Sequence, residues 1–179
     1  MNAALKRMRL ATRIANRSRC RRSVAVHECG HVRLRSAPVI DGARRSDLVS
    51  IRWLLDMESL PSADITEDAL EHFLVYRDEL GIAGVVGLER YGEVALLRSL
   101  VVAAERMGRG LGRRLVAAAE ELAAELNVQS IYLLTTTAAV FFESRGFRYI
   151  EREQAPPAIR ESREFASLCP ATAILMVKP

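Results

Sequence analysis

The stretch that decides the fold is residues 97–126, LRSLVVAAERMGRGLGRRLVAAAEELAAEL. It begins with an apolar run, passes through a short polar connection and reaches glycines at positions 108, 110 and 112. The apolar residues that follow recur at helical spacing, while most of the charged residues avoid their face. We therefore predict a strand over 94–102, a glycine-rich loop and an amphipathic helix over 111–126.

This order of strand, glycine-rich loop and helix is typical of an anion site. Glycines let successive backbone N–H groups converge on a phosphate, and the first turn of the helix presents unpaired amides and a positive dipole end to the same point. Arg109, Arg113 and Arg114 add positive charge nearby. A flexible strand-to-helix connection has the same glycine pattern, so the loop alone leaves that alternative open.

Two common nucleotide-binding loops are excluded by spacing. A P-loop needs Gly-Lys followed by Ser or Thr, whereas Gly112 is followed by Arg113 and Arg114. A dinucleotide fingerprint reads G-x-G-x-x-G inside a βαβ unit, whereas here the glycines alternate and the preceding strands are predicted to be antiparallel.

The remaining pattern predicts an α/β (α+β) domain. Ser46 is the predicted N-cap of a first helix that ends near Leu60, and Thr66 precedes a second, short helix. Three strands in succession are expected to pair antiparallel through tight turns. The predicted strands are 37–40, 73–77, 82–88, 94–102, 130–134, 147–152 and 172–177, and the later helices are 111–126, 137–145 and 157–168.

Charge divides the chain into two parts. Residues 1–45 hold 12 Lys and Arg against two acids, and the other residues hold 14 against 20, so the net charge of +4 comes from the N-terminus. We predict a basic extension without a packed core over residues 1–35 and a folded domain over 36–179. The extension is a solvated tail, a basic arm for nucleic acid or anionic surfaces, or a transit-like segment; the domain itself is acidic and no nucleic-acid partner is expected for it.

The sequence does not favour a membrane protein, a disulfide-bonded protein or a metalloprotein. No apolar run approaches the roughly 18–20 residues of a membrane span, and Cys20, Cys29 and Cys169 lack C-x-x-C spacing. We expect a soluble, cytoplasmic protein without a membrane partner. His27-Glu28-Cys29-Gly30-His31 matches the zinc-protease pattern H-E-x-x-H, but the only other histidine is His72, so we expect no metal and keep zinc binding through His27 and His31 as a remote alternative.

The chain resembles the GCN5-related N-acetyltransferase (GNAT) superfamily. The family signature Gln/Arg-x-x-Gly-x-Gly/Ala corresponds to Met107-Gly108-Arg109-Gly110-Leu111-Gly112, and the later family segment A-x-x-F-Y-E-x-x-G-F corresponds to residues 138–147. Residues 95–100, 132–138 and 165–170 are similar to N-acetyltransferases encoded in arsenic-resistance operons. The resemblance implies a GNAT-type mixed, mostly antiparallel central sheet with helices on both faces.

The implied activity is transfer of an acetyl group from acetyl-CoA, as co-substrate, to the amine of a small molecule, for which an amino-acid-like arsenical or related toxic compound is a candidate. A homodimer is the candidate oligomer. The implied coenzyme-binding residues are Leu100, Val101, Val102, Met107, Gly108, Arg109, Gly110, Leu111, Gly112 and Arg113. Met107 replaces the family's Gln or Arg, and Phe142 replaces a Tyr proposed to protonate the departing thiolate. Phe142 therefore keeps open a non-catalytic, acetyl-CoA-binding or regulatory protein.

The residues of the chemical step are less defined. Glu89 and Glu93 flank a predicted turn and are candidates for the general base, while Tyr132, Tyr149 and Cys169 are candidates for the thiolate donor.

Three further residues are candidates for substrate binding. Arg98 and Ser99 lie in mid-strand and are predicted to project to opposite faces. Arg98 then binds a substrate carboxylate or pairs with an internal acid such as Glu143. Thr135 offers a hydroxyl to the substrate or caps the next helix.

Overall fold

The computed structural model describes residues 39–179. The extension predicted for residues 1–35 and the His27-Glu28-Cys29-Gly30-His31 motif lie outside the described residues. Within residues 39–179, no helix has the length and apolar character needed to cross a bilayer.

A seven-stranded sheet forms the centre of the domain, with the order β1-β2-β3-β4-β5-β7-β6. All neighbouring strands pair antiparallel except β4 and β5, which are parallel. This arrangement confirms the predicted mixed, mostly antiparallel sheet. The strands are β1 (Val39–Gly42), β2 (Phe73–Asp78), β3 (Gly81–Tyr91), β4 (Val94–Val102), β5 (Ser130–Thr135), β6 (Arg148–Ile150) and β7 (Ile174–Lys178).

The helices are α1 (Leu48–Met57), α2 (Leu111–Glu125), α3 (Ala139–Glu143) and α4 (Pro157–Arg160). Single turns of 3-10 helix include η2 (Asp68–His72), which replaces the second predicted helix. The helix predicted over 157–168 is divided into α4 and a π-helical turn, η5 (Glu164–Leu168). Ser46 is not the N-cap of α1; Asp47 occupies that position, and its carboxylate bonds to the Arg44 amide and to Arg77.

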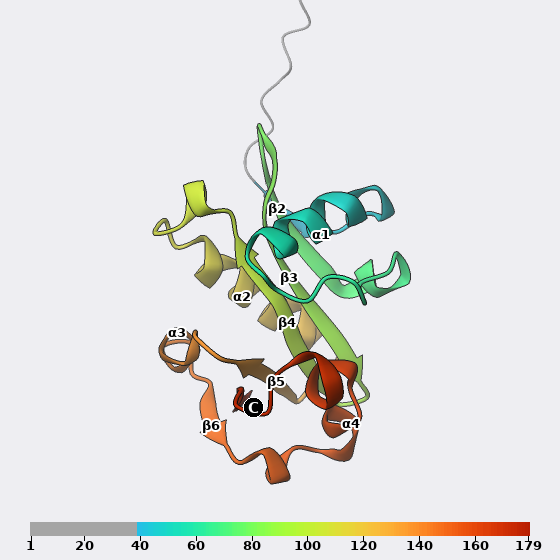
Figure 1. Cartoon of the computed structure of the whole chain (residues 1–179), viewed down its shortest axis with the longest axis vertical. Helices are drawn as coiled ribbons and strands as arrows, with labels where there is room; N and C mark the ends of the chain where they lie inside the picture. The colour runs from blue at the N-terminus through green and yellow to red at the C-terminus, as the bar shows by residue number, and fades with distance from the viewer. Residues whose placement is uncertain (1–38) are drawn as a thin grey trace, which may run out of the picture. The chain divides into compact units, whose positions relative to one another are not determined.

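Helices α1 and α2 cover opposite faces of the sheet, as expected (Figure 1). Successive side chains of a strand point to opposite faces, so Val85 packs in the core beneath α1 while Val86 packs in the core beneath α2. A third, smaller core between the sheet and α4 contains Leu96 and Ile159. Burial on both faces explains why β3 and β4 are apolar almost throughout.

The parallel pair β4 and β5 stays together for only three residue pairs, Val94↔Ser130, Ala95↔Ile131 and Leu96↔Tyr132. Both strands continue beyond this point, to Val102 and Thr135, without pairing to each other. The two strands therefore diverge, and this divergence positions the candidate site.

A β-bulge lies at the start of the diverging part of β4. Gly87 pairs with Arg98 and Val85 pairs with Val101, so β4 has one more residue than β3 between these pairs. Ser99, inside the bulge, has φ of +56°, a backbone conformation that residues other than glycine rarely adopt. The bulge redirects the side chains and peptide groups of β4 at the mouth of the divergence.

Candidate active site

A cavity of about 490 Å³ lies where β4 and β5 diverge. Four segments line this acceptor cleft: residues 58–61 after α1, residues 97–102 of β4, residues 133–138 at the end of β5, and residues between 164 and 173 before β7. The walls are largely apolar, and the ionisable groups among the lining residues are Glu58, Arg98, Glu164 and Cys169.

A second cavity, of about 500 Å³, lies at the N-terminus of α2 and is lined by Val102, Arg106, Met107, Gly108, Gly110, Leu111, Gly112, Arg113 and Phe141. Gly108 and Gly110 both have φ of +74°, which explains why the loop needs glycine there. The amide of Arg114 donates to the Gly110 carbonyl, as the first turn of a helix requires. The amides of residues 111–113 therefore lack partners within the helix and can bind an anion.

The two cavities adjoin each other, because Val102 and Met107 line both of them. The predicted cradle residues Met107, Gly108, Gly110, Leu111, Gly112 and Arg113 are thus brought together with Leu100, Val101 and Val102 of β4. An elongated ligand with a phosphate at one end can follow the edge of β4 from the helix N-terminus into the acceptor cleft.

The edge of β4 that faces β5 is unpaired beyond Leu96. On the opposite edge, the Ala103 amide donates to the Ala83 carbonyl at 2.9 Å. Because peptide groups alternate along a strand, the amides of Val102 and Leu100 point toward the cleft. These amides are available to hydrogen-bond a ligand by addition to the sheet edge.

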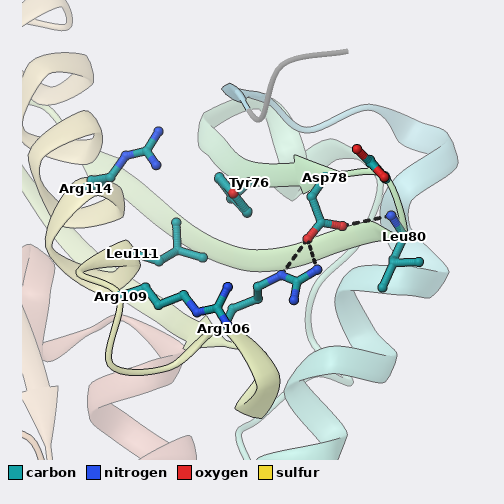
Figure 2. A pocket seen from close by; sticks show the side chains of 8 residues that line it. Tyr76, Asp78, Leu80, Arg106, Arg109, Leu111 and Arg114 are labelled. Carbon is teal, nitrogen blue, oxygen red and sulfur yellow. Dashed lines mark hydrogen bonds and ion pairs between the residues drawn. The ribbon is translucent and has the colours of Figure 1, made fainter. Parts of the chain in front are cut away.

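Arg109 is not among the residues that line the cavity at the N-terminus of α2. It lines a third cavity, of about 440 Å³, together with Arg106, Arg114 and Tyr76 (Figure 2). The Asp78 carboxylate lies 2.7 Å from Nε and 2.6 Å from Nη2 of Arg106. The Arg114 guanidinium lies 5.5 Å from the centre of the Tyr76 ring. These arginines make the surface beside the cradle basic, although the domain is acidic as a whole.

The guanidinium of Arg98 lies among three carboxylates. Asp64 accepts from Nη1 at 2.6 Å and from Nη2 at 3.1 Å, Glu89 also accepts from Nη1, and Glu164 Oε2 lies 3.0 Å from Nη2. The Arg98 side chain is 3% exposed and that of Asp64 is 5% exposed. The cluster therefore carries more acidic than basic groups inside a nearly dry region.

Burial disfavours ionisation of Asp64, but the hydrogen bonds and charge of Arg98 outweigh it and hold the Asp64 pKa below its ordinary value. For Glu164 the balance is the opposite. Burial raises the pKa of Glu164, and the charges of Asp64 and Glu89 add to this, while Arg98 only partly offsets it. Two acids on the same guanidinium thus differ in their readiness to accept a proton.

Arg98 does line the acceptor cleft, but its own partners already surround it. The structure assigns the internal pairing, through Asp64, Glu89 and Glu164 rather than through Glu143, which is exposed. The prediction that Arg98 and Ser99 project to opposite faces is wrong, because the bulge turns Ser99 so that its Oγ lies 3.4 Å from Arg98 Nε.

The two predicted bases are placed differently. Glu89 contacts Arg98 through one carboxylate oxygen and accepts from the Tyr91 hydroxyl at 2.7 Å through the other, and it is not among the residues that line the cleft. Glu93 is exposed in the turn before β4, at the end of the strand that is paired with β5 rather than the end that diverges. Neither carboxylate is brought to the cleft.

Thr135 and the three predicted thiolate donors can be placed in the same way. Thr135 lines the cleft, and its Oγ1 accepts from the Ala138 amide at 3.0 Å, so it caps the turn before α3. Tyr132 packs in the core beside α4, and Tyr149 is 54% exposed with its hydroxyl on Glu151. Of the three donors, only Cys169 lines the cleft.

Phe142 also lines the cleft and is buried, with edge-to-face contacts to Phe141 and Phe147. Its ring offers no exchangeable proton at the place where the resembled family has a Tyr.

Sequence reasoning missed Asp64 and Glu164. Asp64 lies in a loop and Glu164 in a charged stretch that resembles the solvated face of a helix. The one available signal was Arg98 itself, because a charge buried in a sheet requires acidic partners. The sequence could not identify these acids, because they lie 34 and 66 residues from Arg98 and no helical or strand periodicity relates such distant positions.

Comparison with known proteins shows which family the chain resembles. Residues 69–149 match the family model described as an acetyltransferase (GNAT) domain. The matched part contains β2 to β5, the first two residues of β6, the glycine loop and most of the acceptor cleft. This part of the chain is similar to GNAT acetyltransferase domains in sequence, and its fold is consistent with that similarity.

Among individual proteins, the chain is 33% identical over 97 residues to an uncharacterized N-acetyltransferase, CT2212, from Chlorobaculum tepidum. The match covers 52% of this chain and 62% of that relative's length.

Two solved structures have a similar fold. Rv2747 from Mycobacterium tuberculosis, crystallised in complex with CoA and a second ligand, has a TM-score of 0.68 at 23% identity, over 78% of this chain and 98% of that one. N-acetylglutamate synthase from Neisseria gonorrhoeae, crystallised with coenzyme A and N-acetyl-glutamate, has a TM-score of 0.69 at 18% identity, over 80% of this chain and 35% of that one.

Proposed function

We propose that the protein is an acetyl-CoA-dependent N-acetyltransferase that acts on the amine of a small molecule. The observation that carries the proposal is the continuity between the anion cradle of α2 and the unpaired edge of β4. A phosphate cradle alone suits many ligands. A cradle followed by a free strand edge and an acceptor cleft suits a long donor whose phosphates lie far from its reacting end.

The chain's own groups have distinct roles in this proposal. The amides of residues 111–113, supported by Arg113, bind the pyrophosphate. The amides of Leu100 and Val102 bind the arm along the strand edge, and the Leu100 amide, next to the bulge, is placed to donate to the thioester carbonyl oxygen as negative charge develops there. The acetyl thioester supplies the activated carbonyl, and the acceptor cleft orients the amine and excludes water.

For the acceptor, the sequence resemblance supports an amino-acid-like arsenical or a related toxic compound, and hence a detoxifying role. The synthase bound to N-acetyl-glutamate has a similar fold, which makes amino acids a second group to test. The acids around Arg98 outnumber it, so this end of the cleft favours a substrate group with positive charge, such as a cationic amine, over a substrate carboxylate.

The test is release of free CoA thiol from acetyl-CoA by the purified full chain, over a panel of amines that includes amino-acid-like arsenicals, phosphinic amino acids and ordinary amino acids. Omission of the amine measures hydrolysis, and mass spectrometry of the product identifies the acetylated nitrogen. Amine-dependent thiol release with an acetylated product supports the proposal. Absence of CoA binding would overturn it.

A non-catalytic protein that binds acetyl-CoA is the second candidate, because Phe142 leaves the cleft without the family's Tyr. Calorimetric CoA binding without thiol release across the whole panel would favour this candidate. The two functions are thus separated by measurements on the same preparation.

A homodimer stays a prediction. Val49, Trp53 and Met57 recur every four residues along α1, and all three side chains are exposed, Trp53 to 63%. This apolar stripe supports self-association. Light scattering after size exclusion, with Trp53→Glu as the variant expected to be monomeric, tests it.

A further inference from the structure

We infer that Glu164 is the catalytic residue that takes a proton from the attacking amine and passes it to the departing thiolate. The inference rests on the proposed acetyltransfer and identifies the group that performs the proton transfer where Phe142 cannot.

The first argument is the backbone geometry around Glu164. Residues Glu164–Leu168 form a π-helical turn, in which the Cys169 amide donates to the Glu164 carbonyl at 2.9 Å. Such turns are rare and occur frequently at functional sites. Here the wide turn brings residues five apart into contact, so that Cys169 Sγ donates to Glu164 Oε1 at 3.3 Å. An ordinary α-helix, as predicted from the sequence, would not align these two side chains.

The second argument is the position of the carboxylate. Glu164 is only 8% exposed, yet it lines the acceptor cleft together with Ser99, Leu100 and Cys169. Within residues 39–179 its Oε2 accepts no hydrogen bond, although Arg98 Nη2 lies 3.0 Å away. Glu164 thus lines the cleft while its Oε2 is buried beneath the wall, beside the charge of Arg98 and with acceptor capacity that no hydrogen bond uses.

The third argument is the charge that surrounds the carboxylate. Arg98 on β4 favours its ionised form, whereas Asp64 from the loop before η2 and Glu89 on β3 disfavour it. Tyr91, also on β3, is neutral and contacts Glu89, and burial raises the pKa of Cys169 to about 12, so its thiol stays protonated and donates to Glu164. The net result is a raised Glu164 pKa, which suits a group that must both accept and release a proton.

The alternatives on the same cluster are less suitable. All three acids contact Arg98, and Asp64 and Glu89 accept hydrogen bonds through both carboxylate oxygens, whereas Glu164 does so only through Oε1. The main difference is position, because neither Asp64 nor Glu89 lines the cleft and Glu164 does. Arg98 and Cys169 are positioning residues in this scheme, because they hold the two oxygens of Glu164 without exchanging protons with the substrate.

The balanced step is as follows. The neutral amine attacks the thioester carbonyl carbon and forms the N–C bond, and one N–H proton passes to Glu164. The carbonyl re-forms as the C–S bond breaks, and the proton on Glu164 passes to the thiolate sulfur. The products are the acetamide and free CoA thiol, and Glu164 is again a carboxylate.

The test compares Glu164→Gln with the wild-type chain by thiol release across pH, using an amine identified in the panel above. We expect kcat to fall at least about 100-fold with a smaller change in KM. In the wild type, kcat should fall on acidification as Glu164 becomes protonated, which gives the pH profile an acid limb. This limb should be absent from any residual activity of the variant. Because burial raises its pKa, the wild-type limb should lie above the ordinary Glu value of 4.5.

Two further variants complete the experiment. Glu161→Gln changes an exposed acid three residues earlier and should leave kcat and the pH profile unchanged. Cys169→Ala removes the donor to Oε1 and should shift the limb while retaining measurable turnover. Calorimetric CoA binding and circular dichroism verify that each variant is folded and keeps its cradle.

The outcomes separate the two proposals. A wild-type chain that binds CoA but acetylates no amine overturns the proposed function and this inference with it. An active wild type whose Glu164→Gln variant binds CoA and keeps both kcat and the acid limb overturns the inference alone.

Discussion

Asp64 accepts hydrogen bonds from both Nη atoms of Arg98, 34 residues further along the chain, and both side chains are almost fully buried. The pair joins the loop before η2 to the bulged part of β4. Since Glu89 and Glu164 contact the same guanidinium, Arg98 is the cation that all three acids share at this point of the described chain.

Replacing Arg98 should therefore be costly for stability. Arg98→Ala leaves buried carboxylates without their partner, and we expect the free energy of unfolding to fall by about 3–5 kcal/mol. Urea denaturation followed by circular dichroism measures this loss. Arg148→Ala, at an exposed position of β6, is the control and should change stability by less than about 0.5 kcal/mol. An equal, small effect of both variants would contradict the cluster as described.

The low pKa of Asp64 predicts a pH dependence of stability. A carboxylate whose pKa is lower in the folded than in the unfolded state stabilises the fold above the unfolded value, and this contribution is lost as pH falls through the folded pKa. The wild type should therefore lose stability as pH falls below about the unfolded value of 3.8. Asp64→Asn should be less stable at neutral pH and should lose less on acidification. Parallel acid-dependent slopes in thermal melts would argue against the assignment.

The glycines of the cradle can be tested against a matched glycine elsewhere. Gly110→Ala places a side chain at φ of +74°, which should cost about 1–2 kcal/mol of stability and displace the first amides of α2 from the anion. Gly92→Ala, at φ of +67° in the β3–β4 turn, should cost a similar amount of stability. Only Gly110→Ala should weaken CoA binding, measured by calorimetry, by tenfold or more. Comparable losses of affinity in both variants would mean that the cradle is misplaced.

Gly87, the register partner of Arg98, allows close packing within the core beneath α1. A Cβ at this position would lie 2.5 Å from Cε2 and Cζ of the buried Phe73 ring. Gly87→Ala should therefore lower the free energy of unfolding by about 1–3 kcal/mol through overpacking. Gly42→Ala, where nothing lies within 4 Å of the added atom, is the control in the same urea titration. If Gly87→Ala proves as stable as the control, the Phe73 ring must have room to move.

Much of the fold could be predicted because its signals are local. The periodicity of residues 111–126 defines α2, and the turn at Gly92 defines the pairing of β3 with β4. The glycine spacing likewise identifies the cradle, because backbone conformation at 108 and 110 is a property of the residues themselves.

The acceptor end of the site was not predictable in the same way. The partners of Arg98 come from a loop, a strand and a π-helical turn that are distant in sequence, so their convergence depends on tertiary packing. The bulge at Ser99 is a mismatch between two strands, and a single strand's alternation cannot reveal it. The break of the predicted helix over 157–168 arises from the same dependence, since the geometry of η5 is tied to Arg98 through Glu164.

The short parallel seam between β4 and β5 has a consequence for hydrogen exchange. Only three residue pairs join β1–β4 to β5–β7, and past Leu96 the open edge of β4 is paired with no other strand of residues 39–179. The Leu100 and Val102 amides should exchange with deuterium quickly in the free protein, while the Ala103 amide, bonded to Ala83, should exchange slowly. In the proposed function a ligand lying along this edge takes the place of a missing strand, and the last hydrogen bonds of the sheet would then be made by the coenzyme rather than by the polypeptide.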